Sequence, residues 1–375
     1  MCWIKGGNHM KKIAIITNMP SPYRVDFFDY IRHHYEDFKI TVIYFCCSLE
    51  NRQWQINQEK IEEDIFLKSI RFKIKNDFDN RYVFIAKGVK KELKKLGPDV
   101  VIGMEYNPVV IQACRWCKRN NISYISWTDG TLNSEKDINY LQKLSRRYIV
   151  NNSKVYIASS SKAKEAQIAY GAPEKNIFVC YLTVDIDKYH RLNIERDDIQ
   201  LLYVGSLVKR KGVDLLLNAL ALMKRNYKMV IVGDGLEKEN LENLAMQLGI
   251  AQKVHFKGYV EGEELVELYS SSSVFILPTR EDCYALVILE AMCAGLPVVC
   301  SKYADGAYDL IVDEKNGYII NPYDIEELAL VMEKLLIDHT KRERMSEETL
   351  KIVERFRFMN TSKAFVRAVE ASGNG

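Results

Sequence analysis

The sequence holds 375 residues, more than a single hydrophobic core usually serves, which predicts two domains of ordinary size. Hydrophobic residues make up 47% and charged residues 27%, a balance that excludes both a disordered chain and a membrane-embedded one. The net charge of +3 is close to balance and provides no general attraction for nucleic acid, so we expect no nucleic-acid partner.

The cysteines and the first residues indicate a cytoplasmic protein. Nine cysteines is an odd number, and their spacing suggests no disulfide framework, which fits a reducing compartment. No apolar run approaches the roughly 20 residues that a membrane-spanning helix needs. Residues Met1 to His9 lack the apolar region of a secretory signal and are left out of the fold prediction.

From Lys12 onward, short β-branched runs alternate with helical periodicity, the pattern of a parallel sheet covered by helices. The strands expected in the first half are 13–17, 39–45, 100–104, 123–127 and 155–159, and the helices include 25–35, 82–96 and 108–120. A second series has expected strands at 201–205, 229–232, 254–256, 274–277 and 297–300. Both halves are therefore predicted to be α/β domains.

The basic residues of the first half share two expected helices and the segment after them: Lys90, Lys91, Lys94, Lys95, Arg115, Lys118, Arg119, Arg146 and Arg147. Two interpretations stay open. One is a solvated helix face, and the other is a surface that attracts anionic lipid, which gives peripheral contact with the inner face of a membrane.

The two series predict two doubly wound, Rossmann-like domains, at residues 10–183 and 200–354, with a polar linker at 184–199. A last helix at about 355–375 is expected to pack back on the first domain. Two such domains form a cleft where the carboxyl ends of both sheets face each other, and ligands are expected there.

The densest chemical signal runs from Leu277 to Val299, which is expected to form a strand, a loop, a helix and a strand. Asp282 precedes the helix and Glu290 lies inside it, roughly 12 Å away at 1.5 Å per residue. A diphosphate that bridges a sugar and a ribose spans a comparable length. The helix start near Ala285 offers backbone N–H groups and the positive end of the helix dipole, which suit a pyrophosphate.

The two carboxylates would bind hydroxyl groups of the same ligand. Asp282 would bind those of the donor sugar, and Glu290 those of the ribose. The alternative is an ordinary helix with a charged first turn and one solvated glutamate. The apolar neighbours of Glu290 in this helix favour the functional interpretation.

This block resembles the E-x7-E region of the family 4 retaining glycosyltransferases, which have the GT-B fold. The sequence has Asp282 where the family has its first Glu, with Glu281 one place earlier, and Ala285 where the family has Gly. The shorter Asp282 is expected to weaken or retune the contact with the donor sugar, and Glu281 could substitute for it.

The run from Tyr203 to Gly212 resembles the family's glycine and lysine element at the first strand of the nucleotide-binding domain. The resemblance implies that Gly205 lets the backbone approach the phosphate and that Lys211 neutralises diphosphate charge. Ser206 replaces the usual arginine, so Lys209 or Arg210 is expected to supply charge instead.

The resemblance extends through Val230 to Gly235 and Val254 to Val260, and so covers most of the second half. Gly233 to Gly235 alone is interpreted as a tight strand-to-helix turn. The residues that the resemblance assigns to the donor are Gly205, Ser206, Lys211, Gly258, Tyr259, Val260, Asp282, Cys283, Tyr284, Ala285, Leu286, Val287 and Glu290. Gly258 to Val260 would line the base pocket through backbone groups.

The first half resembles the family less and is expected to bind the acceptor. Tyr23 or Arg24, after the first strand, would reach a donor or acceptor phosphate. Trp127 and Asp129 end another strand at the same edge, where many relatives have a histidine. Trp127 could stack on a sugar ring, and Asp129 could steady the acceptor hydroxyl or the charge on the sugar. For both residues, a role as plain turn residues stays open.

The resemblance implies transfer of a sugar with retention, in which the donor phosphate helps to deprotonate the incoming hydroxyl. Lys211, Asp282 and Asp129 are the candidate catalytic residues, and a saccharide or lipid-linked acceptor of bacterial surface polysaccharide assembly is expected. Neither cofactor nor metal is expected, although Asp77 to Asp79 and Asp185 to Asp187 are Asp-x-Asp sequences. Alternatives are an epimerase or phosphorylase of the same fold, or a non-catalytic subunit of a glycosyltransferase complex.

Overall fold

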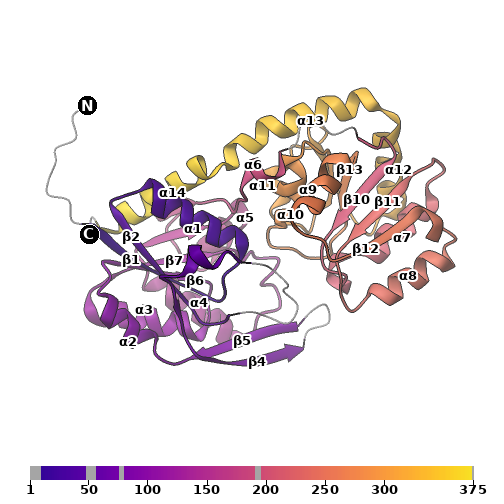
Figure 1. Cartoon of the computed structure of the whole chain (residues 1–375). Helices are drawn as coiled ribbons and strands as arrows, with labels where there is room; N and C mark the ends of the chain where they lie inside the picture. The colour runs from indigo at the N-terminus through magenta and orange to yellow at the C-terminus, as the bar shows by residue number, and fades with distance from the viewer. Residues whose placement is uncertain (1–9, 48–55, 76–79, 191–195, 374–375) are drawn as a thin grey trace, which may run out of the picture. The chain divides into compact units, whose positions relative to one another are not determined.

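The computed structural model describes residues 10–47, 56–75, 80–190 and 196–373. The chain divides into two compact units (Figure 1). Of the described residues, the first contains those within 10–74, 80–182 and 358–373, and the second contains residue 75 and those within 183–357. Within the described ranges, no helix combines the length and the apolar character needed to cross a membrane.

The first unit is built on a parallel sheet in the order β3-β2-β1-β6-β7-β8-β9. Its strands are β1 (Lys11–Thr17), β2 (Phe38–Tyr44), β3 (Ile65–Phe66), β6 (Val100–Met104), β7 (Ser123–Thr128), β8 (Val155–Ala158) and β9 (Ile177–Val179). The central strands are buried over most of their length, as expected for strands covered on both faces. A separate two-stranded sheet pairs β4 (Ser69–Lys75) with β5 (Asn80–Ala86).

Helices cover both faces of this sheet. The helices of the first unit are α1 (Pro22–His34), α2 (Val89–Leu96), α3 (Pro108–Asn120), α4 (Tyr140–Asn151), α5 (Ser161–Ala169) and α14 (Phe358–Gly373). Residues of α1 and α14 share one core with the sheet, and residues of α2, α3, α4 and α5 share the other.

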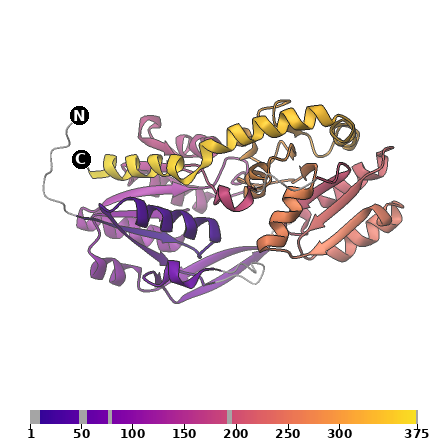
Figure 2. The same cartoon turned by 45° about the horizontal axis from the view of Figure 1, so that its top comes forward.

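The last helix, α14, packs on the first unit beside α1 (Figure 1 and Figure 2). Its Phe365 is fully buried and meets Phe27 edge-on, with ring centroids 6.2 Å apart. Tyr35 and Ser362 join the two helices through their hydroxyl groups, 2.9 Å apart. A segment from the far end of the sequence thus completes the core of the first unit.

The second unit has a parallel sheet in the order β12-β11-β10-β13-β14-β15. Its strands are β10 (Gln200–Val204), β11 (Lys228–Val232), β12 (Val254–Gly258), β13 (Val274–Leu277), β14 (Val298–Ser301) and β15 (Gly317–Ile320). Its helices are α6 (Ile186–Tyr189), α7 (Val213–Leu222), α8 (Lys238–Gln247), α9 (Gly262–Ser271), α10 (Leu286–Cys293), α11 (Ala307–Leu310), α12 (Ile325–Ile337) and α13 (His339–Val353).

The segment expected as a linker, 184–199, belongs in its described parts to the second unit. The helix α6 lies within it and packs on α10. The guanidinium of Arg196 donates to the carbonyls of Ala294 and Gly295, over 2.6 and 3.2 Å.

One predicted helix is wrong. Residues 82–96 form the strand β5, which ends at Ala86, followed by the shorter helix α2. The reason is visible in the local sequence, because Tyr82 to Ile85 is a continuous β-branched and aromatic run. Gly88 then adopts a φ of 101°, which separates the strand from the helix.

Each sheet has one point at which its strand order reverses, between β1 and β6 in the first and between β10 and β13 in the second. Loops that leave two such strands diverge to opposite sides, and the crevice between them is the usual ligand site of an open α/β sheet. The loops after these four strands therefore position both candidate half-sites.

Replacing Phe365 by alanine should destabilise the first unit by about 3–5 kcal/mol, because it leaves a cavity beside Phe27. Urea unfolding followed by tryptophan fluorescence measures this, since all four tryptophans precede residue 128. The matched control is Met359→Ala in the same helix, where the side chain is 57% exposed and the change should stay within about 0.5 kcal/mol. Equal unfolding midpoints for the two variants would contradict the packing of α14.

Candidate functional site

The second unit carries the expected donor residues at the carboxyl ends of its strands. β10 ends at Val204, and the N–H of Gly205 then donates to the carbonyl of Val232 over 3.0 Å. Gly233 has a φ of 137°, and a Cβ there would lie 1.9 Å from the carbonyl oxygen of Gly205. The turn after β11 is therefore tight, as predicted, and it packs directly on the turn at Gly205. Ser206 follows as an exposed residue.

The segment expected to line the base pocket lies beside the same turn. The carbonyl of Gly258 accepts a hydrogen bond from the N–H of Gly233 over 2.7 Å. Tyr259 is 42% exposed and its hydroxyl donates to Glu261 over 2.7 Å, while Val260 is half-buried. The ends of β10, β11 and β12 thus bring the Gly205 and Gly258 segments together.

Two cations meet a carboxylate where the loops after β10 and β13 approach each other. The ammonium of Lys211 donates to Asp282 Oδ2, and a guanidinium nitrogen of Arg210 lies 3.5 Å from the same oxygen. The side chains of Lys211 and Asp282 are only 11% and 14% exposed. Burial opposes ionisation of Asp282, but Lys211 and Arg210 outweigh it and hold its pKa well below the usual range.

The second oxygen of Asp282 binds the loop that leads into α10. Asp282 Oδ1 accepts hydrogen bonds from the N–H groups of Tyr284 and Ala285, over 3.2 and 2.9 Å. Ala285 adopts a φ of 60°, a left-handed conformation that is uncommon for a residue with a side chain. Two N–H groups that the sequence assigns to a pyrophosphate thus already hold a carboxylate, which shows that this loop can bind an anion.

The remaining residues of this block follow in order. Cys283, Leu286 and Val287 are half-buried, and Leu286 opens α10. Glu290 lies within the helix, where the hydroxyl of the fully buried Tyr269 donates to its Oε2 over 2.8 Å. Burial raises the pKa of Glu290, and the hydrogen bonds from neighbouring tyrosines oppose that rise. Glu290 is therefore held by protein partners at the position expected to bind the ribose.

The first unit places Asp129 at the end of β7. Its Oδ1 accepts a hydrogen bond from Arg24, 2.5 Å away, and another from the hydroxyl of Ser159. The Arg24 side chain is 5% exposed and that of Asp129 is 26% exposed. Tyr23, half-buried, lies beside the guanidinium. The charge of Arg24 is buried against Asp129 in this structure, and the expectation that Tyr23 or Arg24 reaches a substrate phosphate stays a prediction.

Trp127 is fully buried, so the expectation that it stacks on a sugar ring is wrong. Its indole N–H donates to Ser159 over 2.9 Å, and the guanidinium of Arg24 lies 4.5 Å from the ring centroid. Strand alternation explains this, because successive side chains point to opposite faces of a sheet that is covered on both sides. Trp127 supports Arg24 from the core.

Glu105 is a candidate that the sequence prediction missed. It follows β6 at the reversal point of the sheet, with a φ of 64°. Its two oxygens accept hydrogen bonds from the N–H of Asp129 and the hydroxyl of Thr128, over 2.7 and 3.1 Å. Burial and the nearby charge of Asp129 raise the pKa of Glu105 to about 8. A charged residue directly after an apolar strand was the available signal.

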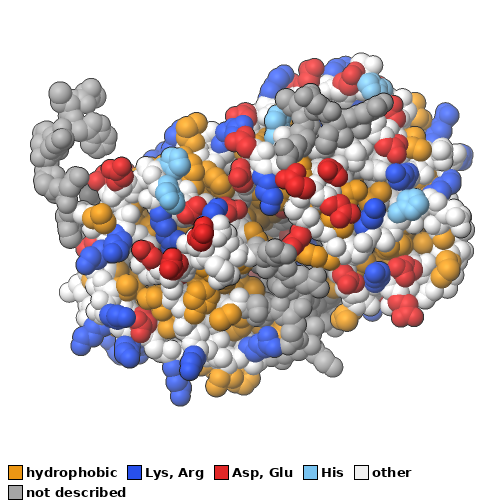
Figure 3. All heavy atoms as spheres, viewed as in Figure 1, with side chains coloured by type: hydrophobic (Ala, Val, Ile, Leu, Met, Phe, Trp, Pro, Cys, Tyr) orange, Lys and Arg blue, Asp and Glu red, His pale blue; other side chains and the backbone are white. Residues whose placement is uncertain are grey.

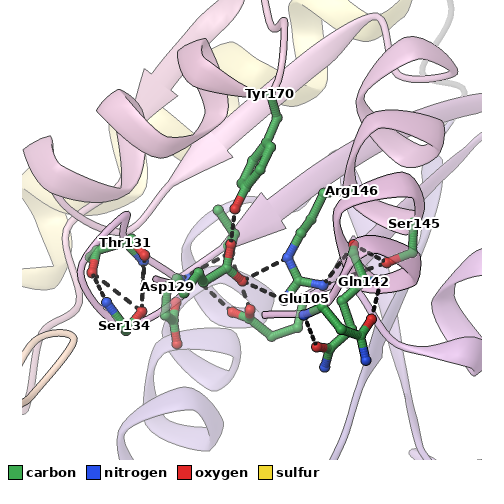
Figure 4. Close-up of polar contacts among 12 residues, drawn as sticks. Glu105, Asp129, Thr131, Ser134, Gln142, Ser145, Arg146 and Tyr170 are labelled. Atoms are coloured by element: carbon green, nitrogen blue, oxygen red, sulfur yellow. Dashed lines mark hydrogen bonds and ion pairs between the residues drawn. The ribbon is translucent and has the colours of Figure 1, made fainter. Parts of the chain in front are cut away.

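A second buried acid network continues from this point (Figure 4). Glu135 accepts hydrogen bonds from Arg146 on α4, at 2.5 Å, and from the hydroxyl of Tyr170, at 2.7 Å. Arg146 was counted among the surface cations, which is wrong, because it is 8% exposed and neutralised here. Figure 4 shows Arg146 and Tyr170 approaching from two sides, with Glu105 nearby.

Of the two Asp-x-Asp sequences, the one at Asp185 to Asp187 lies among the described residues. Asp77 and Asp79 lie outside the described residues. Asp185 precedes α6, and Asp187 forms an ion pair with Arg357 over 2.9 Å. The aspartates of this second sequence therefore lie at the start of α6, and Asp187 is paired with Arg357.

Comparison with known families decides the identity of this arrangement. Residues 185–352 match the model of the glycosyl transferases group 1, and residues 29–188 match the model of glycosyltransferase family 4. Together the two models cover residues 29–352, so the chain belongs to the glycosyltransferases. The two matches correspond broadly to the two units. The match to the group 1 model includes every candidate donor residue.

Relatives of this glycosyltransferase agree with the assignment. It is 31% identical to the uncharacterized glycosyltransferase MJ1607 of Methanocaldococcus jannaschii, over 56% of this chain and 58% of the relative. It is 29% identical to the lipopolysaccharide core biosynthesis glycosyltransferase LpsE of Rhizobium meliloti, over 42% of this chain and 45% of the relative. The matched region thus spans about half the length of these relatives.

The fold of the glycosyltransferase is shared with solved structures. The crystal structure of HepE from Anabaena in complex with UDP covers 96% of this chain and 100% of its own, with a TM-score of 0.77 at 18% identity. This likeness confirms the predicted GT-B architecture of two Rossmann-like domains.

Replacing Glu105 by glutamine should stabilise the glycosyltransferase in a way that depends on pH. The folded chain holds the Glu105 proton up to about pH 8, whereas the unfolded chain releases it near pH 4.5, so wild-type stability falls as the pH rises through this window. Glutamine cannot ionise and keeps the hydrogen-bond acceptor. We expect little difference at pH 5 and a gain on the order of 5 kcal/mol at pH 9.

Urea unfolding at pH 5, 7 and 9, followed by tryptophan fluorescence, measures this gain. The control is Glu165→Gln, where the side chain is 53% exposed and no pH-dependent gain is expected. A gain for Glu105→Gln that is the same at all three pH values would contradict the burial of an ionisable Glu105.

Proposed function

We propose that the chain is a retaining glycosyltransferase that transfers a sugar from a nucleoside diphosphate donor to a saccharide or lipid-linked acceptor. The observation that carries this proposal is the meeting of Lys211, Arg210 and the loop before α10 at the strand-order reversal of the second unit. This place combines fixed positive charge with backbone N–H groups, the chemistry that diphosphates require.

The donor proposal also draws on solved relatives of the same fold. HepE has been crystallised with UDP, with UDP and glucose, and with UDP-glucose. In the proposed complex, the diphosphate competes with Asp282 for Lys211 and for the N–H groups of Tyr284 and Ala285. The displaced carboxylate of Asp282 then turns to hydroxyls of the donor sugar, and Glu290 binds the ribose.

The chemical step needs little beyond positioning and charge. Negative charge grows on the leaving diphosphate, and Lys211 with the amino end of α10 stabilises it in a site with little water. The donor phosphate itself takes the proton of the acceptor hydroxyl. In this proposal Asp129 accepts a hydrogen bond from the acceptor hydroxyl, and the ion pair with Arg24 holds the carboxylate of Asp129 in place.

The kind of acceptor is proposed from the name of a relative and from the chemistry of a lipid-linked saccharide. LpsE acts by its name in lipopolysaccharide core biosynthesis. A role in bacterial surface polysaccharide assembly, at the cytoplasmic face of the inner membrane, fits such a relative and a lipid-linked acceptor.

A panel of nucleotide sugars tests the function directly. The purified chain is melted with UDP-, GDP-, ADP- and dTDP-sugars, because a bound donor raises the melting temperature. The best donor is then incubated alone and its hydrolysis is followed. Slow release of the nucleoside diphosphate supports a transferase. An epimerised donor, or a sugar 1-phosphate that forms only when inorganic phosphate is added, would support the other enzymes of this fold. No stabilisation by any donor would contradict the proposal.

Chelation of divalent metal should leave activity intact. Lys211 and the amino end of α10 supply the positive charge that magnesium would otherwise provide, and we propose that neither metal nor other cofactor takes part. Donor hydrolysis or transfer is measured in excess EDTA, and then with magnesium and manganese added back. Loss of activity in EDTA with recovery on adding metal would contradict the metal-free proposal and make Asp77 to Asp79 the first candidate ligands.

A further inference from the structure

Apolar side chains that face solvent gather at the start of α4 and in the loop before it. Tyr140 and Leu141 are 71% and 74% exposed, and Leu132 and Leu144 are 48% and 41% exposed. Three exposed basic side chains, Lys136, Lys143 and Arg147, accompany them. We call these seven residues the α4 surface. Isolated exposed apolar residues are ordinary, but such a cluster needs an explanation.

The spacing along α4 sorts these side chains by type. At 100° per residue, the exposed residues follow one another around the helix within roughly 160°, in the order Lys143, Arg147, Tyr140, Leu144 and Leu141. The buried residues Arg146, Ile149 and Val150 lie outside this stripe, between roughly 180° and 280° from Tyr140. The helix therefore exposes one stripe with a basic edge and an apolar edge.

The α4 surface is held in place by the fold and is not a frayed helix end. Asn139 and Gln142 form a reciprocal capping box over 2.9 Å in both directions. One turn later, Arg146 is tied to Glu135. The exposure of Tyr140 and Leu141 thus belongs to an ordered helix.

We propose that the α4 surface docks the protein on a bilayer that contains anionic phospholipid. An interfacial helix places its aromatic and leucine side chains among the acyl chains and its basic side chains at the headgroups. The three cations of this surface complement anionic headgroups, and Asp137 is its one exposed acid within the described loop. A buried protein partner would instead be expected to neutralise these cations with acids of its own.

The role of the α4 surface in catalysis rests on the proposed lipid-linked acceptor. Asp129, the proposed partner of the acceptor hydroxyl, lies three residues before Leu132 in the same ordered segment. The segment is held by Glu105 at one end and by Arg146 at the other. Docking through α4 therefore brings the acceptor half-site to the lipid surface where such an acceptor is anchored.

Two other surfaces of the first unit compete for this role. The four lysines of α2, Lys90, Lys91, Lys94 and Lys95, are all exposed, and Figure 3 shows basic side chains gathered at the lower left, where Figure 1 draws α2. The second surface is the β4 and β5 sheet, which exposes Ile70, Phe72 and Ile85. The α4 surface joins both components, apolar and basic, on one helix.

Vesicle cosedimentation of the full chain decides between them. The first probe is a phosphatidylcholine vesicle that contains roughly 30 to 40% phosphatidylglycerol, and the second is a vesicle of phosphatidylcholine alone. We expect the wild-type chain to bind the anionic vesicles, and Leu141→Glu and Tyr140→Ser each to weaken binding about tenfold or more. Lys143→Glu with Arg147→Glu should abolish the preference for anionic vesicles.

Matched controls use exposed residues elsewhere. Leu330→Glu changes a 65% exposed leucine of α12, and Lys90→Glu with Lys94→Glu removes charge from α2. Both are expected to bind vesicles nearly as the wild type does. Melting curves and donor hydrolysis in solution, which should be unchanged for Leu141→Glu, show that the variant is folded.

Several results would overturn the proposal. These are a wild-type chain that does not bind anionic vesicles, a Phe72→Glu or α2 variant that loses binding while Leu141→Glu keeps it, and a Leu141→Glu change that only converts a dimer to a monomer. A chain that binds vesicles through α4 but consumes no nucleotide sugar would contradict the proposed function and leave the docking surface standing.

Discussion

The pairing of Lys211 with Asp282 is the interaction on which the donor half-site depends. It joins the loop after β10 to the loop after β13, at the point where the strand order reverses. Because both side chains are nearly buried, neither charge could stay there alone at an acceptable free energy. The carboxylate also holds the loop before α10 in its left-handed conformation. One ion pair therefore keeps a cation, two N–H groups and a helix end in order before any ligand arrives.

The first unit also pairs a buried cation with a carboxylate close to its strand-order reversal. Arg24 is buried beneath Asp129 and leaves that carboxylate as the more accessible partner. Glu105 stands next to it with a raised pKa, and a buried acid of this kind costs stability near neutral pH. Groups that cost stability and lie at a strand-order reversal are characteristic of functional sites.

The sequence was enough to predict the parallel sheets, because buried strands are apolar throughout and short. The predicted bounds of the strands at 100–104 and 274–277 match the structure. The helix prediction failed in β5, where the β-branched and aromatic run from Tyr82 to Ile85 favours a strand. Periodicity also could not show that Trp127 faces the core, that Arg24 is neutralised, or that Glu105 turns back on Asp129. Such facts depend on which strand ends become neighbours, and that order is set by the whole chain.

The central claim is that Lys211 carries the positive charge that stabilises the leaving diphosphate. The direct measurement is kcat and donor KM for Lys211→Ala beside the wild type, with a melting curve to confirm folding. Removing one such electrostatic group costs about 3 kcal/mol, so kcat should fall about 100-fold while the donor KM changes much less. A variant that keeps the wild-type kcat and changes only the donor KM would contradict the account.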